Sequence, residues 1–87
     1  MYNVRVMQKL LIATKNPGKF NEIVGVLNGL PFEFLFLKDL PEDFGDFDEV
    51  GETFYENALG KARHFAELNG LLTLAEDSGI LIDAFPG

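Results

Sequence analysis

The segment from Thr53 to Gly70 constrains the fold most, because it is a long stretch with a clear helical period. Thr53 and Glu56 have the spacing of a capping box, in which two side chains satisfy backbone amides at the start of a helix. The apolar side chains that follow fall on one arc of about 140°, wide enough to face a core. They are Phe54, Tyr55, Ala58, Leu59, Ala62, Phe65 and Ala66. Lys61 lies at the border of this stripe, where its stem can be buried while its ammonium reaches a groove. His64 falls on the polar face and is expected at the surface.

Shorter apolar runs and turn signals define the other elements. Asn16 followed by Pro17 is typical of the cap and first residue of a second helix, which should end near Asn28. Residues 39–51 are predicted to form a loop and residues 76–79 a turn. Short apolar runs predict buried strands over residues 9–13, 32–37, 71–75 and 80–85. The order strand, helix, strand, helix, strand, strand predicts an α/β fold (or α+β) with one mixed sheet flanked by helices.

Composition excludes several classes of protein. The chain of 87 residues has no cysteine, which excludes disulfide frameworks, cysteine-type zinc sites and thiol nucleophiles. A net charge of −7 disfavours binding to nucleic acid, so no nucleic-acid partner is expected. The apolar runs are too short to span a bilayer, so no membrane partner is expected either. Together with the lack of an apolar signal core in residues 1–8, the missing cysteines predict a cytoplasmic protein.

The charge is unevenly distributed along the chain. Residues 1–38 carry a net charge of +3, and residues 39–87 carry a net charge of −10. One interpretation is a solvated acidic loop. The other is a division of labour, with a basic element for an anionic ligand and a carboxylate element for the cation that accompanies it. Charge alone does not choose between them.

The loop before the first predicted helix carries side chains that suit an anion. A helix N-terminus offers amide donors and a partial positive charge, so phosphate is the natural ligand. Further donors on this loop are Thr14, Lys15, Asn16 and Lys19. A Walker P-loop is excluded, because Ala13 stands where it needs glycine and Phe20 where it needs serine or threonine. In the alternative interpretation Asn16 only caps the helix and the lysines are solvated.

Two groups of carboxylates could bind a metal ion. Glu49, Glu52 and Glu56 surround the start of the long helix, and Mg²⁺ binds through one or two carboxylates plus substrate phosphates. Capping and the helix dipole account for Glu56 and Glu52, whereas Glu49 has no such structural task. Glu76 and Asp77 form the second group, and since neighbouring strand residues point to opposite faces, one of the two is expected to enter a site. An ordinary turn explains the same residues.

Taken together, three blocks of sequence resemble the inosine triphosphate pyrophosphatase family. The first is residues 13–19 with Glu22, the second is residues 51–58 with Lys61 and Ala62, and the third is residues 76–79 with Asp83 and Ala84. Glu76 stands where many members of the family carry aspartate. The resemblance implies a Mg²⁺-dependent hydrolase that converts ITP, dITP or XTP to the monophosphate and pyrophosphate.

The resemblance also implies a role for each site residue. Asp77 would bind Mg²⁺ together with Glu49, and would accept a proton from the attacking water. Lys19 would act in catalysis, and Ser78 and Lys61 would contact the substrate. The triphosphate would be held by Thr14, Lys15, Asn16, Pro17, Gly18 and Lys19.

Domain organisation is expected to follow the same family. Residues 1–87 would form the N-terminal part of a single domain, with residues 1–6 as an extension. The full-length protein would be a homodimer, and the 87-residue chain alone would be inactive. The alternative is a non-catalytic module that binds nucleotide or phosphate.

Overall fold

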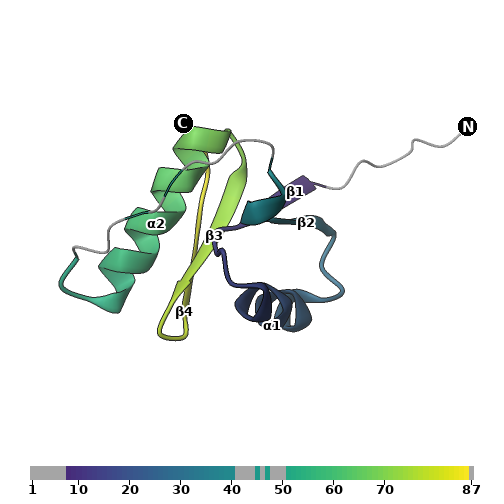
Figure 1. Cartoon of the computed structure of the whole chain (residues 1–87), viewed down its shortest axis with the longest axis horizontal. Helices are drawn as coiled ribbons and strands as arrows, with labels where there is room; N and C mark the ends of the chain where they lie inside the picture. The colour runs from purple at the N-terminus through teal and green to yellow at the C-terminus, as the bar shows by residue number, and fades with distance from the viewer. Residues whose placement is uncertain (1–7, 41–44, 46, 48–50, 87) are drawn as a thin grey trace, which may run out of the picture.

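A mixed β-sheet with helices on both faces organises the computed structural model, which describes residues 8–40, 45, 47 and 51–86 (Figure 1). Within this part of the chain the elements follow in the predicted order. The strands are β1 (Gln8–Ile12), β2 (Phe32–Phe36), β3 (Leu72–Asp77) and β4 (Ile80–Ala84). The helices are α1 (Pro17–Leu27), the short 3-10 helix η1 (Leu37–Asp39) and α2 (Phe54–Asn69). The predicted α/β class is therefore confirmed.

The sheet has the strand order β2-β1-β3-β4 in the described residues. β1 pairs in parallel with both β2 and β3, whereas β3 and β4 form an antiparallel hairpin. Because parallel strands run in one direction, the carboxyl ends of β1 and β3 meet at the same edge of the sheet. The chain segments that follow these ends are thereby brought together, although they are about sixty residues apart in sequence.

Helix α1 begins as the sequence predicts. The Asn16 side chain accepts hydrogen bonds from the backbone amides of Gly18 and Lys19, at 2.8 and 3.3 Å, and Pro17 occupies the first helical position. Within this fully described helix, Ile23 is the buried residue. It packs with one face of the sheet in a core cluster with Leu10, Ile12, Leu72 and Leu74.

Helix α2 covers the opposite face of the sheet (Figure 1). The Thr53 hydroxyl accepts from the Glu56 amide at 3.0 Å, and Gly70 ends the helix in the left-handed conformation at a φ of 69°. Small side chains are buried along this helix, and we call them the alanine seat: Ala58, Ala62 and Ala66, all 0% exposed. Ala62 and Ala66 belong to the core cluster that joins the helix to the sheet. Phe65 packs beside them, in a core cluster with residues of β1, β3 and β4.

The first turn of α2 departs from the prediction. Phe54 and Tyr55 belong to the predicted apolar stripe, yet they are 57% and 52% exposed. Helical period fixes the direction in which a side chain points, but it does not determine whether another element reaches that turn. His64 is less exposed than predicted. Its ring lies against Phe47 and Phe65, and its Nε2 is buried without a hydrogen-bond partner among the described residues.

The β3–β4 hairpin is tighter than predicted. β3 continues to Asp77, so the turn shrinks to Ser78 and Gly79. Their φ angles are 51° and 89°, and positive φ at both central residues suits the twist of a two-residue hairpin. Elsewhere, Leu37 leaves the predicted strand to begin η1. The predicted extension, residues 1–6, lies outside the described residues.

Candidate functional site

The candidate site lies at the carboxyl ends of β1 and β3. In open α/β sheets, ligands bind outside these ends, where loops and helix starts converge. Ala13 to Asn16 connect β1 to α1, and Glu76 and Asp77 end β3. Lys61 reaches the same region from α2. The first and third sequence blocks thus lie at one edge, with a side chain of the second between them.

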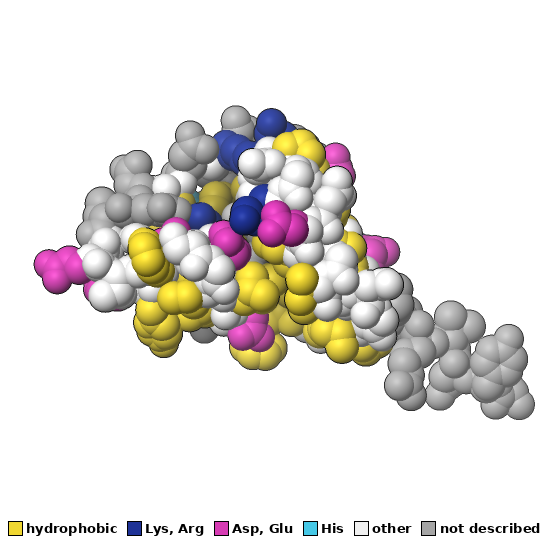
Figure 2. Space-filling view, turned by 90° about the horizontal axis from the view of Figure 1, so that it is seen from below, with side chains coloured by type: hydrophobic (Ala, Val, Ile, Leu, Met, Phe, Trp, Pro, Cys, Tyr) yellow, Lys and Arg dark blue, Asp and Glu magenta, His cyan; other side chains and the backbone are white. Residues whose placement is uncertain are grey.

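A hollow of about 160 Å³ opens on the α1 side of this edge, and we call it the α1 hollow. Its polar lining consists of Thr14, Asn16, Lys19, Lys61 and Glu76. Apolar side chains from the core beneath complete it. Figure 2, which views the molecule from this end, shows basic and acidic side chains adjoining near the centre of the face. The two lysines, with Thr14 and Asn16 as further donors, suit a small anionic ligand.

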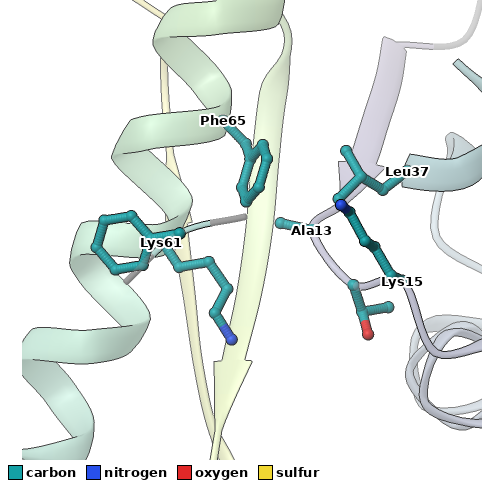
Figure 3. A pocket seen from close by; sticks show the side chains of 7 residues that line it. Ala13, Lys15, Leu37, Lys61 and Phe65 are labelled. Atoms are coloured by element: carbon teal, nitrogen blue, oxygen red, sulfur yellow. The ribbon is translucent and has the colours of Figure 1, made fainter. Parts of the chain in front are cut away.

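A larger hollow of about 300 Å³ lies on the α2 side, and we call it the α2 hollow. Thr14 and Lys61 line it as well as the α1 hollow. Figure 3 shows Lys61 and Lys15 entering it from opposite sides, one from α2 and the other from the loop after β1. Phe47 and Phe65 contribute aromatic surface to it. The two hollows therefore lie next to each other, on either side of the loop that follows β1.

The loop after β1 is held by its own hydrogen bonds. The Asn16 amide donates to the Thr14 hydroxyl at 3.2 Å, and the amides of Gly18 and Lys19 donate to the Asn16 side chain. The first α1 amides are thus partly engaged by the cap, so lysine ammonium groups supply the strongest positive charge for a ligand. At Gly18, an added Cβ would lie 3.2 Å from the capping oxygen, so glycine leaves room for this cap.

Lys19 and Lys61 approach the end of β3 from different helices. The Lys19 ammonium lies 3.5 Å from a carboxylate oxygen of Glu76 and 3.8 Å from one of Glu22. The Lys61 ammonium donates to the backbone carbonyl of Glu76 at 3.4 Å. The predicted position of Lys61, with its stem at the border of the apolar stripe and its ammonium in a groove, is confirmed.

Glu76 and Asp77 point to opposite faces of the sheet. Strand alternation puts Glu76 on the face of Leu74 and α1, where it meets Lys19. The same alternation puts Asp77 on the face of Ala75 and α2. The structure therefore brings Glu76, rather than Asp77, beside Lys19, and Asp77 is not among the residues that line the α1 or the α2 hollow. The predicted catalytic role of Asp77 stays a prediction.

The remaining predicted residues differ in what the structure shows of them. Pro17 and Gly18 form the exposed first turn of α1, and Ser78 is exposed in the hairpin turn. Glu56 serves the capping box, as its structural interpretation predicts. Glu49 lies outside the described residues.

The sequence analysis names Glu76 with Asp77 as a pair of which one enters a site, but it assigns the roles to Asp77 and none to Glu76. A usable signal exists, since counting in steps of two from Leu72 through Leu74 places Glu76 on the face that α1 covers.

Among the described residues, no group of three or more histidine, cysteine, aspartate or glutamate side chains could hold a metal ion. None of the described helices is long and apolar enough to cross a membrane.

Comparison with known proteins agrees with this arrangement. The model of the Ham1 family matches residues 10–87. A dITP/XTP pyrophosphatase from Geobacter sulfurreducens is 51% identical over 81 residues, which cover 93% of this chain and 40% of that protein. A protein of the same name from Oceanobacillus iheyensis is 43% identical, with coverages of 93% and 41%. This chain thus spans about 40% of the length of these curated relatives.

Solved structures show the same fold. A HAM1 protein from Coxiella burnetii superimposes with a TM-score of 0.72 at 37% identity, covering 82% of this chain and 35% of that one. A nucleoside-triphosphatase, dITP/XTP pyrophosphatase, from Mycobacterium abscessus gives a TM-score of 0.66 at 38% identity, covering 78% and 35%. The family model, the relatives and the fold agree with the resemblance carried by the three sequence blocks, and the chain belongs to the Ham1 family.

Proposed function

We propose that this chain carries the triphosphate-binding part of a nucleoside triphosphate pyrophosphatase that acts on dITP, ITP or XTP. The observation that supports this most is the convergence of Lys19 and Lys61 on the polar α1 hollow. The curated relatives are named dITP/XTP pyrophosphatase, which supports the substrate class. The predicted cytoplasmic location and homodimeric state belong to the same proposal.

The lysines would bind and neutralise the phosphates. Hydrolysis between the α- and β-phosphates moves negative charge onto the departing pyrophosphate, and fixed ammonium groups stabilise that charge. Lys19 and Lys61 would supply these ammonium groups from the two sides of β3. Thr14 and Asn16 would donate hydrogen bonds to phosphate oxygens. Lys15 would contact the phosphates from the α2 hollow.

Asp77 would act on the water. The water oxygen attacks the α-phosphorus, the bond from that phosphorus to the bridging oxygen breaks, and pyrophosphate leaves with the bridging electron pair. Asp77 would accept the proton that the water loses, as a general base at the end of β3. Ser78, the next residue along the chain, would contact the substrate.

Carboxylates would hold a Mg²⁺ ion that accompanies the triphosphate. Hard oxygen donors bind this ion, and one or two carboxylates suffice when phosphates and water complete its shell. Asp77 would hold it together with Glu49. When bound, the ion would neutralise phosphate charge and polarise phosphoryl oxygens.

A non-catalytic nucleotide-binding module is the second candidate, favoured by the position of Asp77 away from the α1 hollow. The two proposals differ in the effect of Asp77→Asn. For the pyrophosphatase, in a protein of the relatives' full length, this variant should lower pyrophosphate release from ITP by about 10²- to 10⁴-fold with little change in stability. The 87-residue chain should bind ITP more tightly with Mg²⁺ than without, and Asp77→Asn should remove this gain.

Calorimetric titration of ITP into the chain, with and without Mg²⁺, checks the binding, and a pyrophosphate assay checks turnover. Equal binding by the wild type and Asp77→Asn under both conditions, together with no pyrophosphate release from ITP or XTP by the full-length protein, would favour the binding module.

A further inference from the structure

We propose that Glu76 is a positioning residue that holds Lys19 and Lys61 in place at the two sides of β3. This inference rests on the proposed function, because it assigns Glu76 a task at the same phosphate-binding edge. Glu76 lines the α1 hollow together with both lysines. The carboxylate and the backbone carbonyl of this one residue contact different lysines.

The carboxylate of Glu76 is well placed to fix the Lys19 ammonium. Its oxygen lies 3.5 Å from Lys19 Nζ, and the Glu76 side chain is 16% exposed. The Gly79 amide donates to the same oxygen at 3.2 Å, so the carboxylate is itself anchored to the hairpin turn. Glu22 also lies near Lys19, at 3.8 Å, but its side chain is 71% exposed. Of these carboxylates, Glu76 is the one that the fold holds more firmly.

The backbone of Glu76 contributes the second contact. Its carbonyl oxygen accepts from Lys61 Nζ at 3.4 Å. The tight turn formed by Ser78 and Gly79, with both φ angles positive, fixes the end of β3 where this carbonyl lies. One hairpin tip therefore contacts cations that belong to α1 and to α2.

Holding a lysine in advance affects phosphate binding in a predictable way. A free lysine side chain loses conformational entropy when it binds, so fixing it beforehand strengthens binding. A nearby carboxylate also repels a polyanion, which weakens binding. These effects on phosphate affinity have opposite signs. The direction in which the affinity changes when the charge of Glu76 is removed therefore distinguishes positioning from simple charge balance.

The test uses the 87-residue chain and inorganic tripolyphosphate, titrated calorimetrically without metal. Glu76→Gln should weaken binding about fivefold, because Lys19 must then be ordered by the ligand. Glu76→Asp keeps the charge and should stay within about twofold of the wild type. Glu22→Gln is the matched control, since it removes a carboxylate near the same ammonium, and it should leave binding unchanged or slightly tighter. Circular dichroism verifies that each variant is folded.

A second measurement does not depend on ligand binding. The order parameter of the Lys19 NH₃⁺ group, from side-chain ¹⁵N relaxation, should fall in Glu76→Gln and stay near the wild-type value in Glu76→Asp and Glu22→Gln. An unchanged order parameter in Glu76→Gln would overturn the positioning role. So would Glu76→Gln that binds tripolyphosphate as tightly as the wild type or more tightly. If the wild type binds no tripolyphosphate, the proposed function fails, and the order parameters still decide whether Glu76 holds Lys19.

Discussion

The two helices that flank the sheet differ in how they are held. α2 has 16 residues, is capped at both ends and rests on the alanine seat and Phe65. α1 has 11 residues, and among them, all of which are described, Ile23 is the buried one. Yet α1 carries the Asn16 cap and Lys19, whereas α2 contributes Lys61 to the site. The comparison teaches that binding groups are concentrated at the lightly packed helix, while the heavily packed helix provides the frame.

The largest effect is expected inside α2. Phe65→Ala removes a ring that is 3% exposed, and truncating a buried phenylalanine costs about 3–5 kcal/mol. This is a large part of the stability of a small domain, so the variant should be extensively unfolded in mild urea. Phe54→Ala, in the exposed first turn of the same helix, is the control and should lower the free energy of unfolding by less than about 1 kcal/mol. Urea denaturation of both variants provides the measurement, and equal losses would contradict the burial that separates these positions.

A smaller and more local effect is expected in α1. Ile23→Ala should cost about 2 kcal/mol, at the low end for a buried isoleucine, because we expect α1 to separate from the sheet without unfolding the rest. Amide hydrogen exchange should accelerate in α1 and hardly change in α2. If exchange rises equally in both helices, they form one cooperative unit, and the proposed contrast between them is wrong.

The smallest effects are expected at the helix caps. Asn16→Ala and Thr53→Ala each remove a side chain that accepts from backbone amides, which costs about 1 kcal/mol. The two variants should differ in function, because Asn16 also lines the α1 hollow and Thr53 does not line it. Thermal melting should show similar losses of stability, while calorimetry should show weaker tripolyphosphate binding for Asn16→Ala alone. Weaker binding for Thr53→Ala to the same extent would indicate that the cap acts only through helix stability.

Much of the fold can be predicted from local sequence. Asn16 with Pro17, and Thr53 with Glu56, mark the helix starts correctly because capping depends on residues that are neighbours in the chain. The short apolar runs mark the strands to within one or two residues, because the turn signals that bound each run are also local in the chain. Exposure of Phe54 and Tyr55 could not be predicted, because it depends on which element lies opposite the first turn of α2.

The site is harder to predict than the fold. The lysines stand out by their chemistry and by the family resemblance. The pairing of Lys19 with Glu76 requires the parallel alignment of β1 with β3, and this is a contact between distant parts of the chain. The hairpin adds to the difficulty, because a turn over residues 76–79 and a strand that runs to Asp77 fit the same local sequence, yet the strand alone fixes the faces of Glu76 and Asp77.

The alanine seat also sets the spacing of charges above it. Methyl side chains let α2 lie close to β3, and this closeness allows Lys61 to reach over the strand to the carbonyl of Glu76. A bulkier side chain at Ala62 would push the helix outward and withdraw the ammonium from the strand. The packing of the hydrophobic interior thus determines how far apart the two ammonium groups lie before a ligand binds.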